Sequence, residues 1–200
     1  MDGLIDKLIY PGIVTEVYPE SMENSEYIVT GHISLKIKQF SITAFIPSWT
    51  DYFPSRKKDP LTVQGSELIR RLTGKRIKVI LGFLGYDDED HISHKKSQII
   101  RPYKWNDESI YPQKWIAHYA LTGRIISKAP YSPPPKDYEY LILDCGLKIF
   151  HSAVSKKYQI GDYIMSKGRL DIEIVHLPRL GKHSEQFFNS QLIYRFINSH

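Results

Sequence analysis

The chain has 200 residues, which fits either one large β domain or two modules of about 90 residues each. A hydrophobic fraction of 42%, with 14 Tyr, 8 Phe and 3 Trp, supplies enough apolar mass for folded cores and excludes disorder over most of the length. The single cysteine, Cys145, excludes an intrachain disulfide and a multi-cysteine zinc site, and the net charge of +5 permits a polyanionic partner without requiring one.

Segment 1–11 contains acidic residues and has no apolar stretch long enough for a signal peptide. Nowhere does the chain approach the roughly 18 consecutive apolar residues that a membrane helix needs. Together with the single cysteine, these features lead us to expect a soluble protein of a reducing, cytoplasmic compartment, with no membrane partner.

The first half of the chain alternates short β-rich segments with turn residues. Strands are predicted at 12–18, 27–38, 41–47, 76–84 and 98–101. A helix is predicted at 62–74, between the third and fourth strands, because Thr62 can cap its start and Gly74 can end it. Leu68, Ile69 and Leu72 form the apolar stripe of this helix.

The second half repeats this organisation without the helix, with strands predicted at 120–128, 138–145, 147–153, 162–175 and 191–197. Three pairs of segments match in order between the halves: 12–14 with 123–125, 74–82 with 161–168, and 97–100 with 190–193. They favour an internal duplication. We therefore expect one β barrel at 8–103, an aromatic and proline-containing linker at 104–116, and a second barrel at 117–200.

Segment 158–170 carries a family resemblance, through the turn at Gly161 and Asp162, the alternation after it, and Gly168. It resembles the entry to the fourth strand in oligonucleotide/oligosaccharide-binding (OB) folds of single-stranded DNA-binding and anticodon-binding proteins. The resemblance is to the superfamily only, and the first half departs from it with Lys75 after Gly74. It implies an all-β chain with two five-stranded OB-type barrels in tandem and a helix between strands 3 and 4 of the first.

OB folds that bind single strands use the face of their second and third strands, where aromatic rings stack on bases. In segment 27–38, apolar residues alternate with an outward row that includes His32, Lys36 and Lys38. Phe45 points outward from the next strand. These four residues are the first candidates for nucleic-acid binding.

Further candidates follow from aromatic and basic residues close in sequence. In the first half they are Trp49, Tyr52, Phe53, Arg56, Lys57 and Lys58, and in the second half Arg124, Lys128, Tyr131, Lys148, Phe150, Lys167 and Arg169. The alternative is that the rings close the barrels and the cations are ordinary surface residues. An acidic run at 87–90 also argues against phosphate binding nearby.

No motif in the sequence indicates an enzyme: it has no phosphate-binding glycine loop, no nucleophile elbow and no zinc-protease motif. His91 and His94 are interpreted as part of a solvated acidic loop, and Cys145 as core packing. We expect no catalytic residue, metal or cofactor. The predicted function is binding of single-stranded DNA or RNA with low sequence specificity; the alternative is a protein–protein interaction module or a subunit of a nucleoprotein complex.

Overall fold

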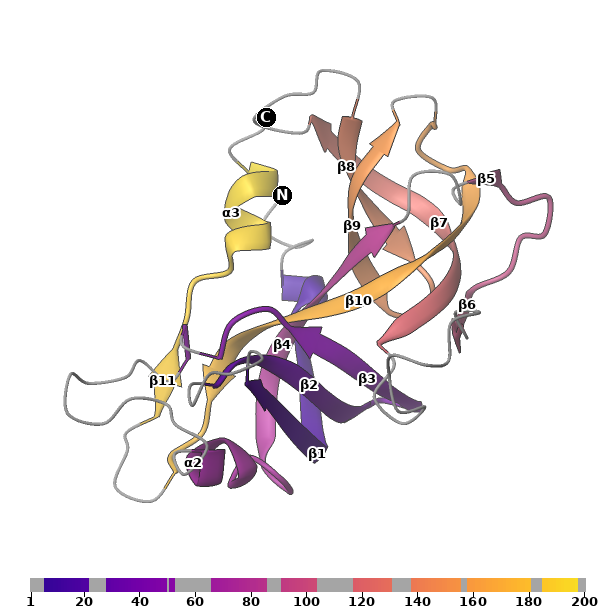
Figure 1. Cartoon of the computed structure of the whole chain (residues 1–200). Coiled ribbons are helices and arrows are strands. Elements are labelled where there is room, and N and C mark those ends of the chain that lie inside the picture. Colours follow the sequence, from indigo (N-terminus) through magenta and orange to yellow (C-terminus); the bar gives the residue numbers. More distant parts are fainter. Residues whose placement is uncertain are drawn as a thin grey trace. The chain divides into compact units, whose positions relative to one another are not determined.

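The computed structural model describes residues 6–21, 28–49, 51–52, 66–85, 91–103, 117–130, 138–155, 158–180 and 185–197, and most of them lie in strands (Figure 1). The helical elements are η1 (Asp6–Leu8), α2 (Ser66–Arg70) and α3 (Gln191–Ile197). The strands are β1 (Tyr10–Ser21), β2 (Ile28–Ile37), β3 (Phe40–Ile46), β4 (Arg76–Gly85), β5 (His91–Ile92), β6 (Ile99–Pro102), β7 (His118–Pro130), β8 (Tyr138–Asp144), β9 (Lys148–Ser155), β10 (Tyr163–Leu177) and β11 (Gln186–Phe187). In this part of the chain, no helix is both long enough and apolar enough to cross a membrane.

The predicted mainly-β fold is confirmed, and every predicted strand except the last is present. Segment 191–197 is helix α3 instead of a strand. Its start is capped by Ser190, whose Oγ accepts a hydrogen bond from the Ile193 N–H at 3.1 Å, while the Tyr194 N–H donates to the Ser190 carbonyl at 3.1 Å. The β-branched and aromatic residues of this segment favoured a strand by propensity, but the serine cap and the helical spacing of its apolar residues decide for a helix.

The chain forms two compact units that are interleaved in sequence. The first unit comprises Ile9–Ile80 and Asp171–Asn189, and the second comprises Met1–Leu8, Leu81–Leu170 and Ser190–His200. Strands β4 and β10, drawn as long arrows in Figure 1, each begin in one unit and end in the other. The two predicted barrels were consecutive, whereas these units exchange the ends of their long strands. The predicted linker, 104–116, lies outside the described residues.

In the first unit, β1 pairs antiparallel with β2 and with the beginning of β4, and β2 pairs antiparallel with β3. β3 pairs in parallel with the second half of β10, where Phe45 is opposite Asp171. Helix α2 lies between β3 and β4 in the chain, as predicted, and contacts β1. The helix ends at Arg70, four residues before the predicted end, and residues 71–74 form a turn. Ile69 in the helix and Leu72 in the turn are fully buried, so this segment adds to the core of the unit.

In the second unit, β7 pairs antiparallel with β8 and with the first half of β10, and β8 pairs antiparallel with β9. β9 pairs in parallel with the end of β4, where Ser152 is opposite Leu84. The prediction that 98–101 is the fifth strand of the first barrel is wrong, because this segment, β6, pairs with β7 in the second unit. The second half of β10 pairs with β3 in its place.

The two units repeat the same backbone hydrogen bonds. Gly74 donates its N–H to the Val14 carbonyl at 2.8 Å, and Gly161 donates to the Ile125 carbonyl at 2.9 Å. Both glycines have left-handed φ angles, 79° and 103°, which glycine adopts without steric cost. A β-bulge follows directly after Val14 in β1 and after Ile125 in β7.

This correspondence continues along the strands. The pair Ile13 and Arg76 is equivalent to the pair Arg124 and Tyr163, and the parallel pair Phe45 and Asp171 is equivalent to Ser152 and Leu84. The predicted matches of 12–14 with 123–125, and of Gly74 with Gly161, therefore fall at equivalent positions. The match of 97–100 with 190–193 does not, because the first is a strand and the second begins a helix.

Candidate nucleic-acid interface

The outer face of β1, β2 and β3 in the first unit is the surface on which the prediction can be examined. Apolar and polar residues alternate along β2 as expected: Ile33, Leu35 and Ile37 are buried, whereas Lys36 is exposed and Ser34 is half-buried. On β3, Ile42, Ala44 and Ile46 are buried in the same core. The outer face therefore presents polar residues of both strands, such as Lys36 and Ser41, to solvent.

His32 is not a freely exposed cation on this face, as the sequence had suggested. Only 6% of its surface is exposed, and its Nδ1 lies 2.7 Å from a carboxylate oxygen of Glu20. Its ring packs edge-on against the ring of Phe45, which lies directly opposite on β3, with centroids 5.4 Å apart. His32 thus holds the half-buried Phe45 in place, and Phe45 keeps part of its ring surface exposed to solvent.

Lys36 and Lys38 lie at the turn between β2 and β3, and both are exposed. Lys36 is opposite Ser41, and one row further along Ser34 and Thr43 share a hydrogen bond of 2.9 Å between their hydroxyls. Lys38 has a left-handed φ of 52°, and its Nζ lies 5.2 Å from the centroid of the Tyr10 ring. The two lysines therefore form a cationic end to this face.

The opposite end of the same face is acidic. Glu16 and Glu20 lie on β1, and the Glu16 carboxylate accepts a hydrogen bond from the Tyr18 hydroxyl. Burial raises the pKa of Tyr18 to about 12, and the hydrogen bond to Glu16 and its negative charge add to this effect. Charge is thus segregated along the strands, with carboxylates toward Glu20 and ammonium groups toward Lys38.

Three aromatic candidates are core residues and cannot stack on a base: Trp49 is fully buried, and Tyr52 and Phe150 are only 8% and 2% exposed. The Tyr52 hydroxyl accepts a hydrogen bond from the Ile174 N–H at 3.1 Å, and its ring packs on Phe188. Burial raises the pKa of Tyr52 to about 12; the hydrogen bond from Ile174 opposes the rise, and the charge of Glu173 adds to it. The candidates Phe53, Arg56, Lys57, Lys58 and Tyr131 lie outside the described residues.

The equivalent face of the second unit is closed. Tyr140, Ile142 and Phe150 occupy its outward positions on β8 and β9, and all three are buried. The short helix η1, with its buried Leu8, contacts β9. An aromatic and aliphatic face of this kind adds to the core instead of offering a binding surface.

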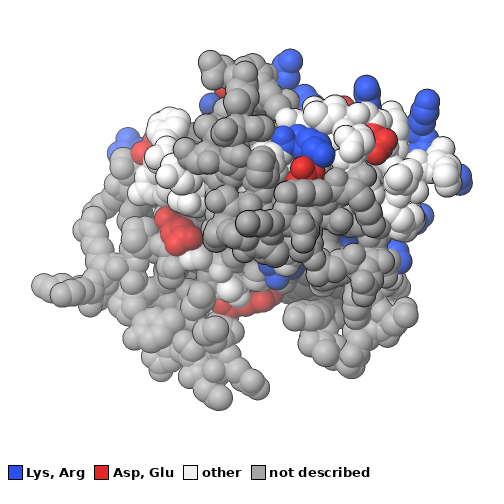
Figure 2. All heavy atoms as spheres, turned by 90° about the horizontal axis from the view of Figure 1, so that it is seen from above, with Lys and Arg blue, Asp and Glu red and all other residues white. Residues whose placement is uncertain are grey.

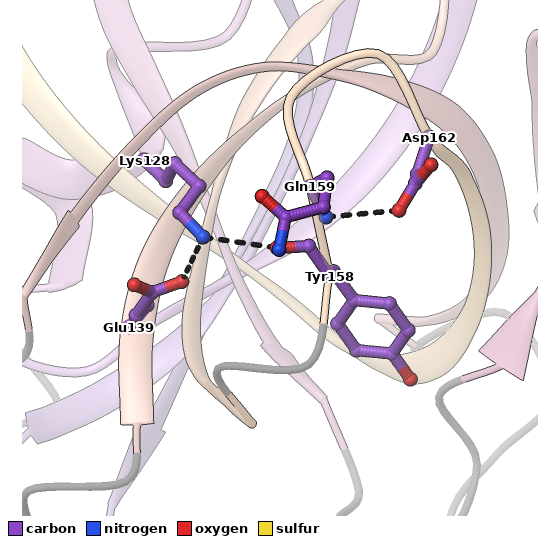
Figure 3. Close-up of polar contacts among 5 residues, drawn as sticks. All are labelled: Lys128, Glu139, Tyr158, Gln159 and Asp162. Atoms are coloured by element: carbon purple, nitrogen blue, oxygen red, sulfur yellow. Dashed lines mark hydrogen bonds and ion pairs between the residues drawn. The ribbon is translucent and has the colours of Figure 1, made fainter.

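Lys128, a candidate in the second unit, has a structural role (Figure 3). Its Nζ lies 2.8 Å from a Glu139 carboxylate oxygen and donates a hydrogen bond to the Tyr158 carbonyl at 2.9 Å. The Tyr158 side chain is fully buried, and the next residue, Gln159, donates its N–H to the Asp162 carboxylate at 2.8 Å. This network holds the turn that leads into β10.

The other basic candidates of the second unit are spread over separate strands. Arg124 is exposed on β7, whereas Lys148 on β9 and Lys167 and Arg169 on β10 are half-buried. The Nζ of Lys167 lies 4.8 Å from the centroid of the Tyr103 ring. On the face seen in Figure 2, Lys and Arg side chains lie among Asp and Glu side chains, so the described part of this face is not uniformly basic.

Sequence reasoning missed two exposed cations of the first unit, Arg76 and Lys78, on β4. Both alternate with the buried Ile77 and Val79, so their side chains point outward. The sequence contained this signal, because Arg76 and Lys78 lie on either side of Ile77 at the spacing of a strand face. The same segment, 74–82, was interpreted only as a match to 161–168.

The second unit contains the histidines and the cysteine that the sequence analysis considered as reactive groups. His91 and His94 are exposed, and the described residues contain no group of three or more His, Cys, Asp or Glu side chains that could hold a metal ion. Cys145 is buried, as predicted, and burial raises the pKa of its thiol, with a further contribution from the charge of Asp144. A thiol in this environment is not activated as a nucleophile.

No protein-family model matches this chain, and no curated protein is similar to it in sequence.

Proposed function

We propose that the protein binds single-stranded DNA or RNA, with low sequence specificity and without catalysis, through the outer face of the first unit. The observation that carries this proposal is the contrast between equivalent faces: the one in the first unit is polar, cationic at one end and open, whereas the one in the second unit is apolar and buried. An exposed polar face does not add buried apolar area to the core, so stability alone does not explain it. We therefore attribute its exposed lysines and half-buried ring to a ligand.

We also propose that each unit is an OB-type barrel whose fifth strand is supplied by the long strand of the other unit. Four features support this assignment. The first strand of each unit pairs with the second and fourth strands: β1 with β2 and β4, and β7 with β8 and β10. The third strand of each unit pairs in parallel with the end of a long strand, β3 with β10 and β9 with β4, and β10 also pairs with β4. Helix α2 lies between strands three and four of the first unit, where OB barrels carry a helix.

In this proposal, Lys36 and Lys38 neutralise phosphates, and Phe45 provides a ring for a base. Stacking on an aromatic side chain contributes about 1–3 kcal/mol per base and tolerates any sequence. The carboxylate of Glu20 lies beyond the row of Phe45 and repels phosphate, so the strand is expected to leave the face after this ring. The intracellular, reducing location expected from the sequence is part of the same proposal.

The test is fluorescence anisotropy of the full chain with labelled oligo-dT and oligo-U over a series of salt concentrations. We expect binding that weakens as salt increases, and at least a tenfold loss of affinity in the double variant Lys36→Gln, Lys38→Gln. The matched control is Lys95→Gln, Lys96→Gln, which removes two exposed lysines from the second unit. Absence of binding at low salt, or equal losses in both variants, would overturn the proposal.

A protein partner is the second candidate, and exposed Phe187 on β11 favours it. This ring is 73% exposed and packs on His176, which lies opposite it on β10. β11 lies at an edge of the sheet, and an edge strand can pair with a strand of another protein. Co-purification of a defined partner that survives nuclease treatment and is lost in Phe187→Ser, together with no oligonucleotide binding, would favour this function over the first.

A further inference from the structure

Four cations of the first unit surround its first strand. Lys36 and Lys38 belong to β2 and the turn after it, and Arg76 and Lys78 belong to β4. β1 pairs with both strands and therefore lies between them. The two sequence segments are forty positions apart and become neighbours only through β1.

The strand register places Lys36 and Arg76 in one row and Lys78 in a neighbouring row, whereas Lys38 lies in the turn after β2. Ile13 on β1 is opposite Lys36 on one side and opposite Arg76 on the other, and all three are exposed. Adjacent strands are about 4.8 Å apart, so the backbones of Lys36 and Arg76 are separated by roughly 10 Å, and Lys78 lies about 7 Å from Arg76 along β4. Long basic side chains at these spacings can all reach one extended polyanion that crosses the strands.

The surface between the cations is apolar. Ile13 is 42% exposed, and Pro11, which is opposite Lys78, is exposed as well. In the part of the chain that the structure describes, Lys36, Arg76 and Lys78 form no ion pair with a carboxylate. Cations beside a small apolar strip match a nucleic-acid strand, whose phosphates need positive charge and whose sugars and bases offer apolar surface.

The equivalent positions of the second unit lack this pattern. The register places Asp144 where the first unit has Lys36, and Tyr163 and Met165 where it has Arg76 and Lys78. Arg124 takes the place of Ile13. The arrangement of charge is therefore not a requirement of the backbone that the two units share.

We infer that Lys36, Lys38, Arg76 and Lys78 form a phosphate track, on which a single strand crosses β2, β1 and β4 beside Ile13. This inference rests on the proposed function and changes its location. The aromatic contact with Phe45 lies at one side of the track, and most of the binding energy comes from backbone phosphates that β4 contacts. The track therefore binds any sequence equally well.

The test compares the native full chain with the double variant Arg76→Gln, Lys78→Gln, using labelled oligo-dT, oligo-U and oligo-dA. Loss of two phosphate contacts is expected to reduce the slope of log affinity against log salt by about 1.4, because each contact with a single strand contributes about 0.7. The affinities for the three oligonucleotides should fall by the same factor. Thermal unfolding verifies that both proteins are folded, since the two side chains are exposed.

The control, Lys95→Gln, Lys96→Gln, removes the same charge from the second unit and should leave the slope unchanged. Binding with an unaltered slope in the β4 variant would overturn the track but leave the proposed function in place. A complete lack of binding by the native chain would overturn both. Equal slope changes in the variant and the control would show an effect of net charge only. Binding of the native chain to vesicles of phosphatidylserine, without binding to oligonucleotides, would indicate a membrane surface instead. Either result would overturn the track.

Discussion

The two units have the same strand register but opposite outer faces. In both, a left-handed glycine before the fourth strand donates to the first strand, and a bulge follows at the equivalent residue. Yet the outer positions of β2 hold a hydroxyl and a lysine in the first unit, at Ser34 and Lys36, where the second unit has Ile142 and Asp144. The backbone hydrogen bonds that determine the register are therefore the same in both units, whereas the side chains on the outer face differ with its exposure to solvent.

The largest effect is expected from Gly168→Ala, in the part of β10 that belongs to the second unit. A Cβ at this position would lie 2.1 Å from the Leu84 carbonyl oxygen, which belongs to the backbone and cannot move aside. We expect a loss of about 3 kcal/mol or more in the free energy of unfolding, measured by urea denaturation. Because β4 and β10 contribute to both units, both should unfold together in one transition.

A matched control for this prediction is Gly74→Ala. A Cβ there has no atom within 4 Å, so only the left-handed φ of 79° opposes the substitution. The expected cost is about 1 kcal/mol. Similar losses for both variants would contradict the close approach of Gly168 to the Leu84 carbonyl. Two separate transitions in Gly168→Ala would contradict the exchange of strand ends.

The next largest effect is expected from Lys128→Met. This change leaves the Glu139 carboxylate, which is 13% exposed, without its cation, and removes the hydrogen bond to the Tyr158 carbonyl. We expect a loss of about 2–4 kcal/mol in the free energy of unfolding. The register places Val17 at the equivalent position of the first unit, where no ion pair is needed.

A double-mutant cycle checks the role of Lys128. Adding Glu139→Gln to Lys128→Met should recover part of the loss, because the remaining side chain is no longer charged. Additive losses from the two substitutions would mean that the ion pair does not stabilise the turn before β10.

Alkaline pH should destabilise the fold through two buried groups, one in each unit, that ionise at different pH. Burial raises the pKa of Cys145 in the second unit and raises that of Tyr52 in the first from 10 to about 12. In each case the unfolded chain releases its proton at a lower pH than the folded chain. Stability is therefore fully present below the unfolded pKa and is lost as pH rises toward the folded pKa.

The loss should begin near pH 9, where Cys145 ionises in the unfolded chain, and increase above pH 10 through Tyr52. By pH 12 the ionisation of Tyr52 in the unfolded chain should lower the free energy of unfolding by about 2 kcal/mol. Urea denaturation at a series of pH values measures it. Cys145→Ala should remove the earlier part of the decline, and Tyr52→Phe the later part. An unchanged pH profile in either variant would show that the group is not the source of the decline.

The smallest effect on stability is expected from Lys36→Ala. Its side chain is exposed and has no ion pair within the described part of the chain, so the free energy of unfolding should change by less than about 0.5 kcal/mol. The same variant should bind oligonucleotides several-fold more weakly. A large loss of stability would show that Lys36 is a structural residue, as Lys128 is in the second unit.

Local patterns predicted the strands well. Alternation located the core residues of β2 and β3, and the glycines at 74 and 161 marked the entries of β4 and β10. Helix α3 was missed because its serine cap was outweighed by the β propensity of the residues after it. The sequence contained the needed signal in each of these cases.

Long-range contacts could not be predicted in the same way. Whether Phe150 is a binding ring or a core ring depends on its burial, and η1, from the other end of the sequence, contacts its strand. The pairing of β6 with β7 likewise depends on partners that alternation does not identify. For the candidate site, sequence alone supplied Lys36, Lys38 and Phe45, but only the register showed that Arg76 lies in the same row.

The shared strands also affect how the chain folds during its synthesis. β3 finds its parallel partner only at Asp171, so this edge of β3 stays unpaired until the second half of β10 has left the ribosome. Non-local pairing of this kind slows folding and leaves a strand edge open to aggregation. A chain truncated before β10 should therefore keep this edge of β3 unpaired and aggregate.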